Sequence, residues 1–449
     1  MAKTIRLKKG YDIKLVGEAP KFKLTFDQPR LYAIKPKDFY GITPRLLVEQ
    51  GSEVKAGDPL FHDKANEQLM FTSPVSGEVV EIVRGARRVI EEIRILSDSK
   101  FEFKNFGTAN PSDSTTESIQ SKMLESGVWP LLRQRPFNKL ANPALEPKAI
   151  FISGFDTAPF GLDVDFVVGD EIDNLQTAID ALAKLSNGKV YLSLSTTQKG
   201  NSKLEKLKGV EIYYVEGVHP AGNVGVQIHH INPINKGEVV WTISPQDALV
   251  IGRLFNKGIY DTNRFIGLAG SELNKRGYVQ TVLGAQISNF VGPNLKNNHV
   301  RIISGNPLTG EKINKEGFLG TYHQSISVIE EGTEPELFGW LLPSYPRPSF
   351  SRTFPSFIFP QAKYKVNTNM HGEERAFVVT GEYEKVVPMD VLPMQLFKAC
   401  LANDIDNMEA LGIYEVVEED IALCEFICTS KLPLQEILRE GLNFVDKEA

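Results

Sequence analysis

The run Ala149-Ile150-Phe151-Ile152-Ser153-Gly154 marks a change of pattern in this chain of 449 residues. Its apolar residues are continuous rather than alternating, which is typical of a strand buried on both faces. Segments typical of helices and strands then alternate: we expect helices over 171–185 and 245–255, and strands over 189–194 and 211–215. Strands that alternate with helices predict an α/β layer built on a mostly parallel sheet.

The part of the chain before this layer is rich in β-forming residues. Apolar and polar residues alternate between glycines over 47–60 and again over 71–83, as in short strands joined by tight turns. The pattern resembles the barrel-sandwich fold of biotinyl and lipoyl carrier domains. Asp63-Lys64-Ala65 is similar to the lipoyl attachment turn. We interpret Lys64 as a plain turn lysine, with a lipoyl-type carrier domain as the alternative.

Three further units follow the α/β layer. Glycine-rich β patterns return over 264–330 and are similar to the small β-grasp-like domain that follows the flavin domain in soluble redox modules. The stretch after it is rich in Pro and Phe and cannot be regular helix, because it contains Pro343, Pro346, Pro348, Pro355 and Pro360. Helices are expected over 390–401, 405–411 and 434–442.

These patterns predict an α+β multidomain protein. The expected units are a barrel-sandwich β domain (1–105), an α/β Rossmann-like domain with its linker and first helix (106–262), a β-grasp-like domain (263–330), a Pro/Phe-rich β extension (331–387) and a C-terminal helical domain (388–449).

Composition excludes several classes of protein. A hydrophobic content of 42% and a charged content of 24% are those of an ordinary soluble protein, and a formal charge of −6 gives no basic face for nucleic acid. There is no apolar run of about 18 residues and no apolar signal-peptide core, so neither a membrane span nor a leader is expected. Three cysteines provide no disulfide framework, as in a reducing cytoplasm.

Half of an iron–sulfur motif lies in Glu418-Glu419-Asp420-Ile421-Ala422-Leu423-Cys424-Glu425-Phe426-Ile427-Cys428. A bacterial ferredoxin cluster uses the spacing C-x2-C-x2-C-x3-C. Glu418 and Ile421 stand at the first two ligand positions, and Cys424 and Cys428 stand at the last two. Because a cluster needs four thiolates, we expect no metal here. Two thiols four residues apart share one helix face, so we expect both to be buried as small hydrophobes.

A second candidate is the loop His219-Pro220-Ala221-Gly222-Asn223-Val224-Gly225. Such a loop can hold phosphate when it opens a helix, but Val226-Gln227-Ile228 predicts a strand after it, so we interpret the loop as a structural turn. His229 and His230 would point to opposite faces of that strand. We therefore expect no metal site from His219, His229 and His230.

The third candidate is Trp129-Pro130-Leu131-Leu132-Arg133-Gln134-Arg135-Pro136-Phe137, which we expect to end a helix over 116–132. Its aromatic and guanidinium groups can stack on a flat ring system. The alternative is a helix end capped by proline, with arginines on the surface. No nucleophile elbow, P-loop or dinucleotide fingerprint is present, so no catalytic residue is assigned.

The order of these modules resembles the NADH- and flavin-binding subunit of respiratory complex I and the C subunit of the Rnf complex. In those relatives a glycine-rich loop lets the backbone approach the flavin. Here the matching place holds the bulky 129–137 segment, and an acidic-cysteine-acidic-proline turn is replaced by Ser153-Gly154-Phe155-Asp156-Thr157-Ala158-Pro159. The resemblance therefore implies that the flavin, nicotinamide and cluster sites are lost together.

One family combines this architecture with these losses: the chain is identified as a member of the A subunits of the bacterial Na+-translocating NADH:quinone oxidoreductases. The motifs that carry the resemblance are spread in order along the chain. They are Ile5-Arg6-Leu7-Lys8-Lys9-Gly10, Ser73-Pro74-Val75-Ser76-Gly77, Arg84-Gly85-Ala86-Arg87-Arg88, Arg135-Pro136-Phe137, His219-Pro220-Ala221-Gly222, Val300-Arg301-Ile302-Ile303-Ser304-Gly305, Glu336-Leu337-Phe338-Gly339-Trp340 and Leu423-Cys424-Glu425-Phe426-Ile427-Cys428.

The resemblance implies a peripheral subunit on the cytoplasmic face of the bacterial inner membrane. Five partner subunits would complete a complex that oxidises NADH, reduces ubiquinone and exports Na+, and membrane contact would run through them. The flavins and iron centres would belong to those partners, so the isolated chain would bind no cofactor and catalyse nothing. A quinone contact would use Trp129, Arg133, Arg135 and Phe137. The alternative is an independent flavin- or quinone-binding oxidoreductase.

Overall fold

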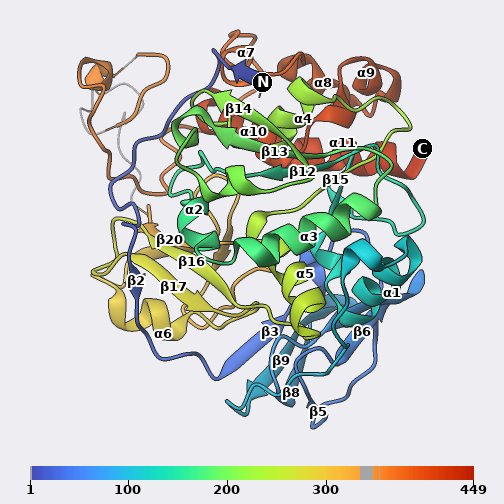
Figure 1. Cartoon of the computed structure of the whole chain (residues 1–449). Helices are drawn as coiled ribbons and strands as arrows, with labels where there is room; N and C mark the ends of the chain where they lie inside the picture. The colour runs from blue at the N-terminus through green and yellow to red at the C-terminus, as the bar shows by residue number, and fades with distance from the viewer. Residues whose placement is uncertain (1–2, 334–346, 353, 449) are drawn as a thin grey trace.

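A seven-stranded sheet in the order β1-β14-β13-β12-β15-β10-β11 lies at the centre of the computed structural model, which describes residues 3–333, 347–352 and 354–448 (Figure 1). Strands β12 (Ile150–Ser153), β13 (Val190–Ser195), β14 (Val210–Glu216) and β15 (Val240–Thr242) are parallel to one another, and β10 (Arg133–Arg135) and β11 (Lys139–Leu140) close one edge antiparallel. The predicted α/β layer with a mostly parallel sheet is confirmed.

Helices cover both faces of this sheet because the side chains of β12 alternate between them. Ile150 and Ile152 join the core that includes α3 (Ile172–Lys184) and α5 (Pro245–Lys257), whereas Phe151 packs with α4 (Val224–Ile231). Helix α3 packs directly against α5, and the short helix α2 (Val164–Val168) contacts α5. A strand buried on both sides explains why its apolar run does not alternate.

Two small sheets form the barrel-sandwich domain. One contains β3 (Leu31–Ile34), β9 (Ile90–Ser97), β8 (Gly77–Arg84) and β5 (Glu53–Val54), and the other contains β4 (Pro44–Leu46), β6 (Pro59–Asp63) and β7 (Asn66–Thr72). Lys64 lies in the two-residue turn between β6 and β7 and is exposed. Helix α1 (Thr116–Ser126) packs on β7.

The first strands of the chain lie outside the barrel-sandwich sheets. Strand β1 (Lys3–Arg6) is the edge strand of the central sheet, parallel to β14, and β2 (Lys23–Leu24) pairs with β17 (Gly277–Thr281) in a third region. The unit predicted over 1–105 therefore contributes to three parts of the fold. Nothing in the composition of these short strands indicates a partner so far along the chain.

The β-grasp-like domain is a six-stranded mixed sheet. Its order is β19 (Glu311–Ile313), β18 (Val300–Ser304), β20 (Ser325–Glu330), β16 (Arg264–Ala269), β17 and β2, with the short helix α6 (Ser288–Val291) beside it. Isolated bridges then connect the Pro/Phe-rich stretch to the body: Tyr364 pairs with Leu15, and Asn367 pairs with Glu330. This stretch contains a 3-10 turn, η8 (Pro355–Ile358), and α7 (Tyr383–Val386). Glu336-Leu337-Phe338-Gly339-Trp340, Pro343 and Pro346 lie outside the described residues.

The C-terminal domain is helical, as predicted. Its helices are α8 (Pro393–Ala402), α9 (Ile405–Ala410), α10 (Glu418–Ile427) and α11 (Leu434–Glu448). Their shared core contains the three cysteine side chains among Leu396, Phe397, Leu438 and Leu442. In Figure 1 this C-terminal domain lies beside α4 and the central sheet.

Two predicted elements are wrong. The helix expected over 116–132 ends at Ser126, because Gly127 takes a left-handed conformation (φ 81°) that stops it, and a 3-10 turn, η4 (Trp129–Leu131), follows. The strand expected at Val226-Gln227-Ile228 is part of helix α4. Three residues that alternate apolar and polar fit either period, and a helix of two turns is too short for its own period to stand out.

Candidate functional site

A cavity of about 550 Å³ lies where the α/β domain, the β-grasp-like domain and the C-terminal helices meet. Ser153, at the end of β12, and Thr242, at the end of β15, form part of its wall. Tyr322 and Gln324 contribute from the β-grasp-like domain, and Glu419 contributes from α10. Ligands of open α/β sheets bind outside the carboxyl ends of the strands, so this is the expected place for a site.

Arg133 of β10 lines this cavity. Its guanidinium lies over the ring of Tyr322, 4.9 Å from the ring centroid, and the Tyr322 hydroxyl donates a hydrogen bond of 2.7 Å to the Pro130 carbonyl. Burial raises the pKa of Tyr322, so its ring stays neutral under the cation. Among the described residues Arg133 forms no ion pair. The Tyr322 ring therefore holds a positively charged donor group in place at the cavity wall.

Arg135, two residues further along the same strand, is committed to the protein itself. Its side chain is 2% exposed; Nη1 lies 2.8 Å from Oδ2 of Asp420, and Nη2 donates to Glu419. Although burial alone lowers the pKa of Arg135, the carboxylates of Asp420 and Glu419 raise it overall. Burial raises the pKa of Asp420 to about 6, with Arg135 opposing that effect. This buried pair joins α10 to the central sheet.

The same carboxylate covers the amino end of helix α4. Asn223, which precedes the helix, donates from Nδ2 to the Glu419 carbonyl at 2.8 Å. A Cβ atom on Gly225 would lie 2.3 Å from Oδ2 of Asp420, so the carboxylate rests directly on the first turn. The positive end of the α4 dipole is thus already matched by a negative charge. The His219–Gly225 loop does open a helix, but the chain's own carboxylate takes the place of a phosphate.

The three histidines of the predicted group do not converge on one point. His229 and His230 do not point to opposite faces as predicted, because they lie on helix α4, and their rings meet edge to face with centroids 5.0 Å apart. His219 lines the cavity, and its Nδ1 lies 3.2 Å from Oγ1 of Thr157; burial lowers its pKa to about 4. His229 contacts Glu415 at 2.6 Å, and His230 contacts the Pro388 carbonyl at 2.7 Å, both toward the C-terminal domain. Within the described ranges no cluster of three or more His, Cys, Asp or Glu side chains is suited to a metal ion.

Trp129 and Phe137 lie in cores away from the cavity lining. Trp129 is fully buried, meets Trp241 edge to face, and donates its indole N–H to the Ala141 carbonyl at 2.7 Å. Phe137 packs against Tyr414, with ring centroids 5.9 Å apart. Of the four residues considered for a flat ligand, the structure brings Arg133 and Arg135 to the cavity and leaves the two aromatic rings outside its lining.

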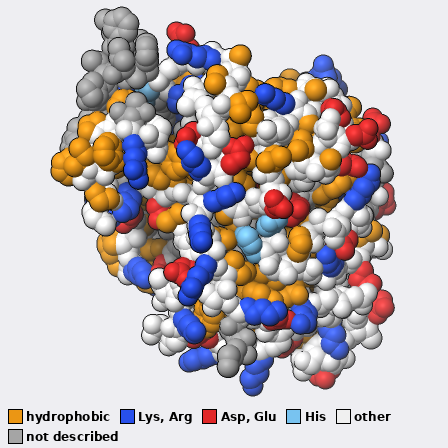
Figure 2. All heavy atoms as spheres, turned by 90° about the horizontal axis from the view of Figure 1, so that it is seen from above, with side chains coloured by type: hydrophobic (Ala, Val, Ile, Leu, Met, Phe, Trp, Pro, Cys, Tyr) orange, Lys and Arg blue, Asp and Glu red, His pale blue; other side chains and the backbone are white. Residues whose placement is uncertain are grey.

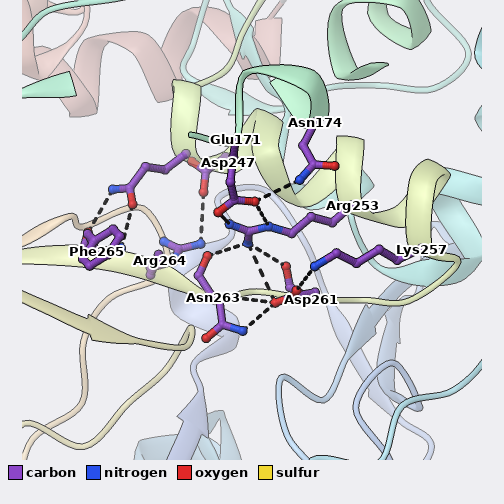
Figure 3. A network of polar contacts seen from close by, with 10 residues as sticks. Glu171, Asn174, Asp247, Arg253, Lys257, Asp261, Asn263, Arg264 and Phe265 are labelled. Carbon is purple, nitrogen blue, oxygen red and sulfur yellow. Dashed lines mark hydrogen bonds and ion pairs between the residues drawn. The ribbon is translucent and has the colours of Figure 1, made fainter. Parts of the chain in front are cut away.

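A polar network fixes the wall formed by α5 (Figure 3). Asp247, in the first turn of α5, lies 3.0 Å from Arg264 of β16, whose other amino group donates to the Thr321 carbonyl at 3.0 Å. Further along α5, Arg253 pairs with Glu171 and donates to the Asn263 carbonyl. These contacts tie α5 to the β-grasp-like domain through Arg264 and Asn263, and to Glu171 within its own α/β domain.

The cysteine pair lies away from the cavity, in the helical core. Cys424 and Cys428 are fully buried, as predicted, and Sγ of Cys428 is 2.9 Å from the Tyr383 hydroxyl. Burial raises the pKa of Cys424 well above its usual value, so this thiol is neutral. The acidic first turn of the same helix contributes Glu418 and Glu419 to the cavity lining. In the sequence, only the run of three carboxylates indicates that this turn could belong to a site.

Three family models match consecutive parts of the chain. They are described as the NqrA N-terminal barrel-sandwich hybrid domain (5–98), the NqrA second alpha/beta domain (114–260) and the NQRA C-terminal domain (265–315). The A subunit of a Na+-translocating NADH-quinone reductase from Yersinia pestis is 37% identical over 99% of this chain and 100% of its own length. The chain belongs to the NqrA family.

Two more members of the NqrA family, from Serratia proteamaculans and Vibrio atlanticus, are 36% and 35% identical over 99% of the chain. A solved NAD+-reducing [NiFe]-hydrogenase is 11% identical, with a TM-score of 0.39 over 76% of this chain and 62% of that one, too weak a likeness to place a ligand. In the part of this NqrA chain that the structure describes, no helix is both long and apolar enough to cross a membrane.

Proposed function

We propose that this chain is a peripheral subunit of a Na+-translocating NADH-quinone reductase on the cytoplasmic face of the bacterial inner membrane. It binds neither flavin nor an iron–sulfur cluster, and it holds a ubiquinone headgroup at Arg133 in the cavity between its domains. Five partner subunits carry the flavins and iron centres, oxidise NADH and export Na+. The isolated chain catalyses no reaction, and its role in the complex is to dock and to contact quinone.

The observation that carries the quinone proposal is the position of Arg133. A quinone headgroup is a flat ring whose oxygens accept hydrogen bonds, and a guanidinium fixed on an aromatic ring offers donors in a plane. Apolar side chains stand around it in the same cavity, among them Leu131, Phe155, Leu162 and Ile243. Polar and apolar side chains share the lining, and a cavity of a few hundred cubic ångströms with placed donors has the size of a small-ligand site.

The carboxylate at the amino end of α4 supports the absence of a flavin. A flavin phosphate would need that helix end or a comparable set of donors. Asp420 already lies against Gly225, and Arg135 is paired with it, so an incoming phosphate would meet a buried negative charge. The residues present therefore do not fit a flavin mononucleotide at this helix end.

Titration of the purified chain with a short-chain ubiquinone, followed by calorimetry, tests the quinone site. We expect Arg133→Ala to weaken binding about tenfold, because one charged donor contributes roughly 1–2 kcal/mol. Phe137→Ala is the matched control, since Phe137 lies outside the cavity lining, and it should bind as the wild type does. Unchanged affinity of Arg133→Ala would remove the proposal.

The absorption spectrum of the chain purified under native conditions distinguishes the proposed function from the alternative, an independent flavin-binding oxidoreductase. We expect no flavin band and no iron–sulfur absorption. Stoichiometric flavin released on denaturation would contradict the proposal and favour the alternative. An intact mass equal to the sequence mass would likewise dispose of a lipoyl group on Lys64.

A further inference from the structure

One stretch of the surface, outside the cavity lining, differs in composition from the rest of the chain. Residues 347–372 contain no Asp or Glu, in a chain with 56 acidic residues. They contain four basic residues and five aromatic ones, which are Arg347, Arg352, Lys363, Lys365, Phe350, Phe354, Phe357, Phe359 and Tyr364. We call this stretch the aromatic segment. Its local charge is opposite in sign to that of the whole protein.

The tip of the aromatic segment is apolar and exposed. Phe357, Ile358 and Phe359 follow one another and are 51%, 60% and 47% exposed. Figure 1 shows this orange part of the chain projecting from the body, and Figure 2 shows hydrophobic side chains gathered at the edge of the molecule beside the residues drawn in grey. Soluble proteins rarely expose three large apolar side chains in a row, so the tip points to a surface that it contacts.

The base of the aromatic segment is fixed to the body. Tyr364 pairs with the chain near Leu15: its amide donates to the Lys14 carbonyl at 2.8 Å, and its own carbonyl accepts from the Val16 amide at 2.9 Å. Nζ of Lys14 donates to the Pro360 carbonyl at 2.8 Å, directly after the tip. The apolar tip is therefore held outward by its base and does not fold back onto the protein.

The charges around the tip are positive or balanced. Lys363 pairs with Glu18 at 2.6 Å, and Lys365 pairs with Glu272 at 2.9 Å. Lys14, by contrast, binds backbone and amide oxygens beside the tip, and Arg352 is exposed. An apolar tip with basic residues around its base and no carboxylate of its own stretch matches the layered chemistry of an anionic bilayer surface.

We propose that the aromatic segment inserts its tip into the headgroup region of an anionic lipid bilayer, so that this chain contacts lipid directly. The exposed apolar residues of the tip are consecutive, the segment projects from the body (Figure 1), and basic side chains lie beside it, which fits insertion into an anionic interface. The contact is independent of the quinone cavity. It adds a lipid contact of the chain's own to any contact that runs through partner subunits.

Flotation of the full chain with lipid vesicles tests the proposal. Vesicles of phosphatidylcholine mixed with phosphatidylglycerol should carry the chain upward. Phe357→Ser with Ile358→Ser and Phe359→Ser should lower the partition coefficient at least about tenfold, because each apolar side chain contributes to insertion. Leu392→Ser with Leu401→Ser is the matched control, since these residues are 52% and 54% exposed on the C-terminal domain. The control should float as the wild type does.

A second variant, measured with two kinds of vesicle, separates the contribution of the basic side chains from that of the apolar tip. Lys14→Gln with Arg352→Gln should weaken flotation with the anionic vesicles and leave flotation with pure phosphatidylcholine vesicles unchanged. Equal flotation of the wild type and the triple serine variant, with unchanged circular dichroism, would overturn the proposal. So would a wild type that floats with neither vesicle while the triple variant fails to join the complex, because the tip would then bind a partner protein.

Discussion

The two ends of helix α10 differ in what surrounds them. Its first turn carries Glu418, Glu419 and Asp420, which reach across to Arg439 of α11 and Arg135 of the central sheet. Its last turns carry Cys424 and Cys428 into an apolar core. The residues that stand on the iron–sulfur spacing are divided between these surroundings: Glu418 is part of an ion-pair network, and the thiols are packing groups. One helix thus both joins two domains and fills the core of one of them.

Asp420→Ala breaks the first end of this comparison and should have the largest effect. Removing the carboxylate leaves the buried guanidinium of Arg135 with Glu419 alone, and losing one partner of a buried pair costs about 3–5 kcal/mol. Urea unfolding followed by circular dichroism measures the loss. Asp170→Ala is the control, because the Asp170 carboxylate likewise forms an ion pair, with Lys203, but is 99% exposed. It should leave the midpoint unchanged. Equal urea midpoints for Asp420→Ala and the wild type would show that the Arg135–Asp420 ion pair does not stabilise the fold.

His219, on the cavity side of the same junction, should make stability depend on pH. Its folded pKa of about 4 lies below the usual 6.5, so between these values the unfolded chain binds more protons. Stability therefore falls as pH falls through this window, by about 3 kcal/mol in total. Subtracting the urea stability curve of His219→Asn from that of the wild type isolates this contribution. A difference that stays constant from pH 7 to pH 4 would contradict it.

Gly225→Ala tests the contact between the first turn of α4 and the Asp420 carboxylate at the acidic end of α10. The new Cβ would lie 2.3 Å from Asp420, so α4 and α10 would have to separate, at a cost of about 1–3 kcal/mol. Gly372→Ala is the control, because the nearest atom to its Cβ position is Cε of Lys431 at 3.5 Å, an ordinary contact, and its φ lies outside the left-handed region. Thermal unfolding of both variants measures the effect. A Gly225→Ala variant as stable as Gly372→Ala would mean that the Asp420 carboxylate does not press on the first turn of α4.

Cys424→Ala changes the apolar end of α10 and should have the smallest effect on stability. It removes one buried sulfur from an apolar core, which costs about 1 kcal/mol. The same unfolding measurement should show this small loss, with no change in the absorption spectrum. Loss of a bound metal together with the thiol would contradict a packing role.

Local pattern explains which parts of the fold can be predicted from the sequence. The strand at 150–153 and the helices at 172–184 and 245–257 follow from runs long enough to show their period. Helix α4 is not predicted, because two turns containing adjacent histidines do not distinguish the helix period from the strand period. The predicted helix before Trp129 is too long because its true end depends on one residue, Gly127, in a left-handed conformation.

The site is harder to predict because its parts are distant in sequence. Arg133 stands out among its neighbours, but the ring beneath it, Tyr322, belongs to another domain. Arg135 and Asp420 are separated by 285 positions, so no local pattern could pair them. Burial of the thiols, in contrast, follows from their own spacing on an apolar helix face.

The edge strand β1 has a consequence for the order in which the sheet can be built. Lys3 pairs with Tyr213, so during synthesis β1 leaves the ribosome 210 residues before its partner. At ordinary translation speeds that interval is about 10–40 s, far longer than the formation of a hairpin. Throughout that time the first strand has no place in the sheet. Pairing of β1 must therefore wait for β14, even though the barrel-sandwich strands between them can already fold.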